Sequence, residues 1–167
     1  MKTIVIYTSK TGFTKRYAQW IAEAARADCL ELSAAKKKDL TAYDAIIFGG
    51  WACAGRISQI KWFKGSIDKW ADKKLIAFCV GASPVDNPEI DIALKRNFNE
   101  SEQKNVKAFY CPGGFNYEKM SITSKLIMKM FVTALKAQKN KTEAEQIMVK
   151  MISSSYDISD KKYIEPI

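Results

Sequence analysis

Residues 4–21 of this 167-residue chain have the sequence IVIYTSKTGFTKRYAQWI. The β-branched residues and the Tyr at its start predict a buried strand, and the spacing of Tyr17, Ala18 and Ile21 predicts a helix after Thr14. The stretch therefore leads from a strand directly into a helix, through a turn that contains hydroxyl side chains, a Lys and a Gly.

This turn has the composition of a phosphate site. The N–H groups in the first turn of a helix have no intrahelical partner, and the helix macrodipole adds partial positive charge there. Gly12 would let the backbone approach an anion without a side chain in the way. An ordinary capped helix start is the alternative that these residues leave open. The Walker A and dinucleotide-binding patterns are both absent from the turn.

Later apolar runs show little polar alternation, which is typical of strands buried on both faces of a parallel sheet. Helical spacing between and after these runs predicts the intervening helices. The order of strand and helix indicates an α/β fold in three layers, with a doubly wound five-stranded parallel sheet. We expect the further strands at 29–33, 43–50 (ended by two glycines), 75–81 and 106–111, and the later helices at 56–72, 88–98, 120–139 and 142–152.

The composition is that of an ordinary soluble protein, with 47% apolar and 27% charged residues. We expect one domain over residues 1–167 with an extra basic helical region at about 119–152, and a cytoplasmic location, because no signal-peptide layout or membrane-spanning run is present. The net charge of +9 favours acidic partners or an anionic membrane, although a solvated Lys-rich surface explains it equally well. Nucleic acid is not expected, because no binding motif accompanies the charge.

The chemistry-bearing residues exclude several kinds of site. The four cysteines contain no C-x-x-C pair, so they indicate neither zinc nor a dithiol motif, and we expect reduced thiols. The chain has no His, which excludes Ser–His and Cys–His catalysis. We therefore assign no catalytic side chain and no metal, and expect a cofactor to carry any chemistry.

The first turn resembles the flavodoxin signature, in which a strand ending in an aromatic is followed by Ser/Thr-x-Thr-Gly-x-Thr and an Ala. The residues that match are Tyr7, Ser9, Thr11, Gly12, Thr14, Ala18 and Ile21. The resemblance implies a flavodoxin-like sheet of strand order 2-1-3-4-5 and an FMN cofactor held by its phosphate. Over residues 3–152 the chain is similar to the flavodoxin-domain branch that includes menaquinone-dependent protoporphyrinogen dehydrogenase. That similarity rests on the first turn, a Gly-Gly loop, a Pro-Gly-Gly loop and the basic helical region.

The resemblance implies which loops hold the cofactor. We expect phosphate contacts from Ser9, Lys10, Thr11, Gly12, Phe13 and Thr14. We expect flavin-ring contacts from Trp51, Ala52, Cys53, Ala54, Gly55, Gly81, Ala82, Ser83, Pro84, Pro112, Gly113 and Gly114. Two residues have alternative interpretations: Trp51 either stacks on the ring or packs under its loop, and Cys53 is either reactive or simply a small apolar neighbour.

The resemblance indicates an FMN-dependent oxidoreductase that transfers electrons or hydride through the flavin N5. The alternatives are a one-electron carrier flavodoxin and a flavin-free interaction domain. The second flanking aromatic of a carrier is absent from 81–84, which favours a ring open to substrate. Tyr110, Phe115 and Tyr117 either line that opening or serve as core or loop anchors. The branch implies a redox partner or a small-molecule substrate of the quinone or porphyrinogen class.

The basic helical region leaves its partner open. Residues 119–136 are basic and amphipathic, which favours peripheral contact with the inner face of a membrane, or else a helix packed on the domain with its lysines in water. A flavodoxin closes with a long helix, whereas residues 163–167 form only a stub. Either the segments at 120–152 cover the sheet in its place or a partner does. An oligomer is compatible with both.

Overall fold

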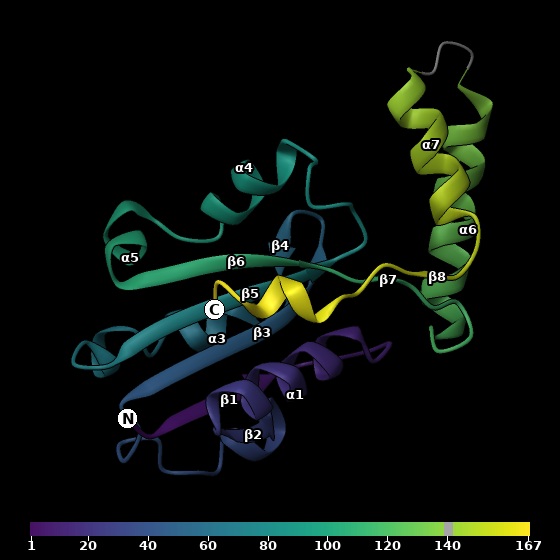
Figure 1. Cartoon of the computed structure of the whole chain (residues 1–167). Coiled ribbons are helices and arrows are strands. Elements are labelled where there is room, and N and C mark those ends of the chain that lie inside the picture. The colour runs from purple at the N-terminus through teal and green to yellow at the C-terminus, as the bar shows by residue number, and fades with distance from the viewer. Residues whose placement is uncertain (139–141) are drawn as a thin grey trace.

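The apolar runs form one parallel sheet in the computed structural model, which describes residues 1–138 and 142–167 (Figure 1). Its strands lie in the order β2-β1-β3-β5-β6, and a short β4 pairs antiparallel with the end of β3. The predicted α/β fold and the 2-1-3-4-5 order are confirmed, since β5 and β6 are the fourth and fifth parallel strands of the chain. The strands are β1 (Thr3–Tyr7), β2 (Asp28–Glu31), β3 (Ala45–Cys53), β4 (Arg56–Ile57), β5 (Lys74–Gly81) and β6 (Val106–Pro112).

Both faces of the sheet carry a hydrophobic core, because successive side chains of a strand point to opposite faces. In β1, Ile4 and Ile6 belong to one core and Val5 to the other. One face is covered by α1 (Phe13–Ala25) and by the C-terminal 3₁₀ turn η2 (Lys161–Ile164). The helical segments packed on the opposite face are α2 (Leu32–Ala35), α3 (Ile60–Lys64), η1 (Asp68–Trp70) and the region around α4 (Glu89–Lys95).

Two glycines that were predicted to end the third strand lie inside it instead. A Cβ on Gly49 would be 2.0 Å from the Phe78 ring, and a Cβ on Gly50 would be 2.6 Å from the Ser58 carbonyl oxygen. The glycines are therefore required by close packing, and β3 continues past them to Cys53. The predicted end of the strand was wrong because this crowding comes from residues distant in the sequence.

The single helix predicted over 56–72 is also wrong. Its first residues form β4, which turns back onto β3, and the remainder is divided into α3 and η1. Its apolar residues nevertheless reach the core, where the Phe63 ring stacks on Phe48 at 5.4 Å. A further helix, α5 (Glu100–Asn105), was not predicted, although Asn99 and Glu102 form the capping box that marks its start.

The last part of the chain leaves the sheet and returns to it. Helices α6 (Ile122–Ala137) and α7 (Glu143–Ile152) form a hairpin that projects beyond the end of the sheet (Figure 1). They lie close to the helices predicted at 120–139 and 142–152, although Lys139 lies outside the described residues. The base of the hairpin is a ribbon of β7 (Gly114–Phe115) and β8 (Tyr156–Asp157), at a place where sequence patterns indicated only a loop and a polar tail.

The hairpin does not replace the missing closing helix. Instead, the terminal residues Tyr163, Ile164 and Ile167 pack against the core beneath α1. Of the two interpretations of the missing cover, the one that used residues 120–152 is therefore wrong. The short C-terminal segment supplies part of that cover itself.

Candidate functional site

The turn between β1 and α1 lies at the carboxyl end of the sheet. Thr8 N–H donates to the Gly49 carbonyl at 3.0 Å, which joins the turn to β3. Gly12 precedes the helix with a φ of 102°, a left-handed conformation that favours glycine, and its N–H donates to Ser9 Oγ at 3.2 Å. No side chain of the described residues caps α1, so the N–H groups of its first turn remain available to an anion.

A cavity of about 450 Å³ opens beside this turn. Of the predicted phosphate contacts, Thr11, Gly12 and Phe13 line it. The other three lie elsewhere: Ser9 accepts the hydrogen bond from Gly12, the Lys10 ammonium lies 5.1 Å from the centre of the Trp51 ring, and Thr14 is buried in the first turn of α1. The remaining lining residues are Lys15, Arg16, Gln19, Phe115, Asn116, Lys119, Ser155, Tyr156 and Asp157.

Lys119 is one of the residues near the turn that sequence patterns did not select. Its Nζ lies 3.8 Å from the position that a Cβ would occupy on Gly12. The sequence marks it only as one of many lysines in a basic segment, because nothing local indicates that the chain returns to the first turn.

A second cavity, of about 230 Å³, lies between the β3–β4 hairpin, the loop after β5 and α4. Five of the predicted ring contacts line it, namely Ala52, Gly55, Gly81, Ala82 and Ser83. The predicted contacts that do not line it are Trp51, Cys53, Ala54, Pro84, Pro112, Gly113 and Gly114.

Those remaining predicted contacts have identifiable places. Trp51 is partly exposed beneath Lys10, and Cys53 is exposed near the tip of the hairpin. Pro112 ends the buried part of β6, and Gly113 N–H donates to the Gly81 carbonyl at 2.7 Å. The structure thus brings the loops after β3 and β5 together around one cavity. Residues 112–114 do not line it, but their backbone is hydrogen-bonded to the end of β5.

The two loops around the second cavity are held by a buried polar side chain, Asn97, and a partly buried one, Tyr110. Asn97 Oδ1 accepts from Ile57 N–H at 2.8 Å, and its Nδ2 donates to the Gly55 carbonyl at 3.2 Å, so this side chain fixes the β3–β4 hairpin. The Tyr110 hydroxyl accepts from Ser83 N–H at 3.0 Å and donates to the Ser83 carbonyl at 2.8 Å. Both anchors are distant in sequence from the loops that they hold, which is why sequence patterns did not identify Asn97.

The aromatic candidates for lining an opening separate in the structure. Phe115 lines the larger cavity and Tyr110 the smaller one. Tyr117 donates its hydroxyl to the Ile152 carbonyl at the base of the α6–α7 hairpin.

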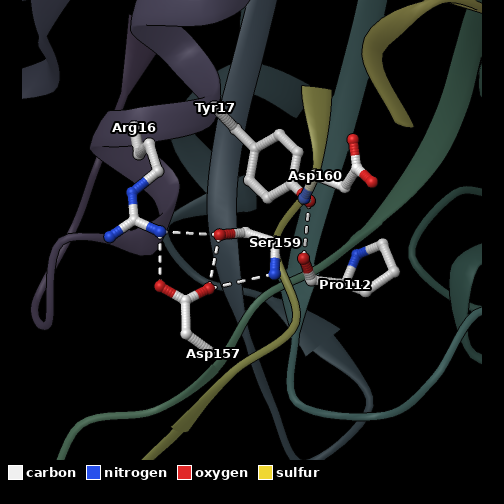
Figure 2. A network of polar contacts seen from close by, with 6 residues as sticks. All are labelled: Arg16, Tyr17, Pro112, Asp157, Ser159 and Asp160. Atoms are coloured by element: carbon white, nitrogen blue, oxygen red, sulfur yellow. Dashed lines mark hydrogen bonds and ion pairs between the residues drawn. The ribbon is translucent and has the colours of Figure 1, made fainter. Parts of the chain in front are cut away.

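The segment after β8 is fastened to α1 by the network in Figure 2. Arg16 donates to Asp157 Oδ2 at 2.5 Å and to Ser159 Oγ at 2.6 Å. Burial by itself raises the pKa of Asp157, but hydrogen bonds from Ser159 and Arg16 outweigh it and hold that pKa below its usual value. The Asp157 carboxylate is therefore ionised at neutral pH and keeps Arg16 at the edge of the larger cavity.

Tyr17 forms the inner half of this network. Its hydroxyl donates to the Pro112 carbonyl at 2.6 Å and accepts from Asp160 N–H at 3.1 Å (Figure 2). Burial raises the pKa of Tyr17, so the hydroxyl keeps its proton and remains a donor. The network joins α1, β6 and the C-terminal segment behind the larger cavity.

The described residues, 1–138 and 142–167, contain no group of three or more His, Cys, Asp or Glu side chains placed to hold a metal ion. No helix among them has the length and hydropathy needed to cross a membrane.

Comparison with known proteins gives a family match. A family described as "Flavodoxin domain" matches residues 4–155. No curated protein matches the chain.

Solved structures with a similar fold have low sequence identity. A putative flavoprotein from Bacteroides uniformis is 20% identical, with 77% of this chain and 97% of that chain covered and a TM-score of 0.46. Oxidised flavodoxin 2 from Bacillus cereus is 19% identical, with coverage of 67% and 84% and a TM-score of 0.48. A flavodoxin, WrbA-like protein from Agrobacterium tumefaciens is 19% identical, with coverage of 91% and 95% and a TM-score of 0.45. Likeness at this level says nothing about ligand or activity.

Proposed function

Because the chain belongs to the flavodoxin domain family, we propose that it binds FMN and acts as a redox flavoprotein. The observation that carries this proposal is the uncapped, left-handed start of α1 at Gly12, at the edge of the sheet where doubly wound folds bind ligands. The alternative interpretation of this turn as an ordinary capped helix start is disfavoured, because no described side chain caps it.

The residues present fit the two ends of FMN. A phosphate ester needs N–H donors and positive charge: the first turn of α1 has N–H groups without a side-chain cap, and basic side chains line the cavity beside it. An isoalloxazine ring needs a slot bordered by small residues and main-chain groups, and the second cavity is bordered by Ala52, Gly81 and Ala82. Bound FMN would supply one- and two-electron redox chemistry. The chain would bind the phosphate, orient the ring between the two loops and limit access of water to it.

We propose an enzyme rather than a carrier as the finer assignment, with a quinone or a porphyrinogen as the substrate class. Two features support it: the similarity over residues 3–152 to the protoporphyrinogen dehydrogenase branch, and the absence of an aromatic in the loop 81–84. Because the loop 81–84 carries no aromatic side chain, the ring face on that side would stay accessible to a substrate. Anaerobic photoreduction separates the two assignments, because a carrier is reduced in two resolved one-electron steps and an enzyme of this type in one two-electron step.

The decisive experiment for FMN binding is a visible absorption spectrum followed by titration with FMN. We expect flavin bands that stay with the protein through gel filtration. Gly12→Asp should abolish binding, because it places a carboxylate where the phosphate would lie and a side chain on a left-handed backbone. A wild-type protein that stays colourless with excess FMN would refute the proposal and leave the flavin-free interaction domain as the better account.

We also propose that α6 contacts an anionic membrane surface, which would place a cytoplasmic protein at the inner face of the membrane. Ile122, Leu126 and Met130 follow one another at intervals of four residues and are 87%, 58% and 65% exposed. Lys125 and Lys129 border this apolar face and match the charge of anionic headgroups.

Sedimentation with vesicles tests this membrane contact. Wild-type protein should sediment with phosphatidylglycerol vesicles and not with phosphatidylcholine vesicles. The double variant Leu126→Ser, Met130→Ser should lose that binding, whereas Ile92→Ser, which changes an equally exposed apolar residue on α4, should keep it. A different result would assign the face to a second copy of the chain: the wild type binds no vesicles but self-associates with rising concentration, and the double variant does not self-associate.

A further inference from the structure

Lys119 reaches the first turn of α1 from a distant part of the chain, just before α6. Its Nζ lies 3.8 Å from the Cβ position of Gly12 and lines the larger cavity together with Thr11 and Gly12. Lys119 makes no ion pair with any residue in the described part of the chain. A cation without a carboxylate partner therefore lies beside helix N–H groups that have no side-chain cap.

Local hydrogen bonds hold the backbone that carries Lys119. Its N–H donates to Asn116 Oδ1 at 3.1 Å, which forms a turn before α6. Within that turn, Tyr117 N–H donates to Ser155 Oγ at 3.0 Å, and the Tyr117 hydroxyl donates to the Ile152 carbonyl. The turn is thus fixed to the chain that returns from α7.

The returning chain is itself fixed to α1. β8 pairs with β7, which immediately precedes the Lys119 turn, and Asp157 of β8 binds Arg16 in the first turns of α1. The two strands at the base of the α6–α7 hairpin are therefore tied to the helix whose N-terminus faces Lys119. This arrangement keeps the Lys119 backbone close to Gly12 while its long side chain stays free to adjust.

The neighbouring cations are not equivalent to Lys119. Arg16 is already paired with Asp157 and Ser159, and Lys10 lies over the Trp51 ring. Lys119 is the cation whose ammonium lies at Gly12 itself. Lys15 also lines the larger cavity, but the structure places the Lys119 ammonium at Gly12, beside the N–H and hydroxyl groups of the turn.

We propose that Lys119 binds the phosphate monoester of the cofactor, so that the base of the α6–α7 hairpin forms part of the cofactor site. This inference rests on the proposed function. An ammonium adds a charge-assisted hydrogen bond to the neutral donors of the turn. At a partly exposed site, where water screens the charge, we expect its loss to weaken binding by about tenfold. Because the hairpin supplies this contact, the cofactor would link the hairpin to α1.

The test compares FMN with riboflavin, which has the same ring and no phosphate, by fluorescence titration of the apoprotein. Lys119→Ala should weaken FMN binding by about tenfold and leave riboflavin binding within about twofold of wild type. Lys119→Arg should restore most of the FMN affinity. Lys150→Ala removes the same charge from an exposed position in α7 and should leave FMN affinity unchanged. The difference between Lys119→Ala and wild type should narrow at high salt, because the lost interaction is ionic.

If the wild type and Lys119→Ala bind FMN with equal affinity, the role of Lys119 is overturned and the proposed function stays intact. An equal loss of FMN and riboflavin affinity in Lys119→Ala would also overturn it, because the lysine would then act on the ring or on folding. Absence of any flavin binding by the wild type would refute the proposed function and this inference together. Inorganic phosphate that competes with FMN in the wild type, and more weakly in Lys119→Ala, would support the inference.

Discussion

Replacement of Tyr17 by Phe removes a single oxygen atom from the centre of the network that holds the C-terminal segment on α1. Tyr17 is fully buried, and its hydroxyl donates to the Pro112 carbonyl and accepts from Asp160 N–H. The phenyl ring can keep its packing against the core, so the substitution isolates the two hydrogen bonds. We therefore expect a loss of stability with little rearrangement.

The magnitude follows from the environments of the two partners. The Pro112 carbonyl belongs to a fully buried residue and would lose its hydroxyl donor, which costs about 1–3 kcal/mol. Asp160 is exposed, so its N–H can bind water instead and costs little. We expect Tyr17→Phe to lower the free energy of unfolding by about 2 kcal/mol, or Tm by about 4–8 °C for a chain of this size.

The assay is urea unfolding followed by far-UV circular dichroism, with Tm from calorimetry. Tyr163→Phe is the matched control, because Tyr163 lies in the same C-terminal segment and its hydroxyl makes no hydrogen bond with the described residues. The control should stay within about 0.5 kcal/mol of wild type. A Tyr17→Phe protein as stable as wild type, or a control that loses as much, would show that the network does not fasten the segment.

Three further predictions concern the site and its supports. Asn97→Ala should lower the free energy of unfolding by about 2–3 kcal/mol in urea unfolding, because it leaves N–H and carbonyl groups of the β3–β4 hairpin without partners, and an unchanged midpoint would contradict this. The pKa of Asp157 is lower in the folded state, so its contribution to stability is present above the unfolded-state pKa and is lost as pH falls through the folded-state pKa. The difference in free energy of unfolding between wild type and Asp157→Asn should therefore shrink below about pH 4. A difference that stays constant with pH would contradict this prediction. Burial raises the pKa of the Cys79 and Cys111 thiols to about 12. In native apoprotein at pH 8, maleimide should therefore label the exposed Cys53 first and label Cys79 and Cys111 only after unfolding, which peptide mass spectrometry would measure. Equal labelling rates in the native state would contradict the burial of Cys79 and Cys111.

The layout of the sheet is readable in local sequence patterns. Continuous apolar runs mark the strands that are buried on both faces, and the weak alternation at 29–33 marks the edge strand β2, so the five parallel strands could be placed from the residues alone. Their order came from the resemblance carried by the first turn. The Gly12 turn was likewise readable, because a glycine and hydroxyl residues between a strand and a helix are themselves the local signal.

Tertiary structure decided the features that depend on residues far apart in the chain. Gly49 and Gly50 looked like the end of a strand because their real constraint, crowding by Phe78 and Ser58, is invisible in their neighbours. The apolar residues of 56–72 have helical spacing, yet Arg56 and Ile57 pair with the end of β3. This hairpin pairing satisfies backbone N–H and C=O groups that would otherwise lack partners.

The same reason explains what sequence patterns missed in the candidate site. Asn97 was not identified because its partners lie in a hairpin that precedes it by several elements. Lys119 has the same residue type and surroundings as other lysines of a basic segment, and only the return of β7 and β8 to α1 brings it to Gly12. Local pattern thus determined which groups the first turn offers to a ligand. The contacts between distant segments decided which charged and polar side chains surround it.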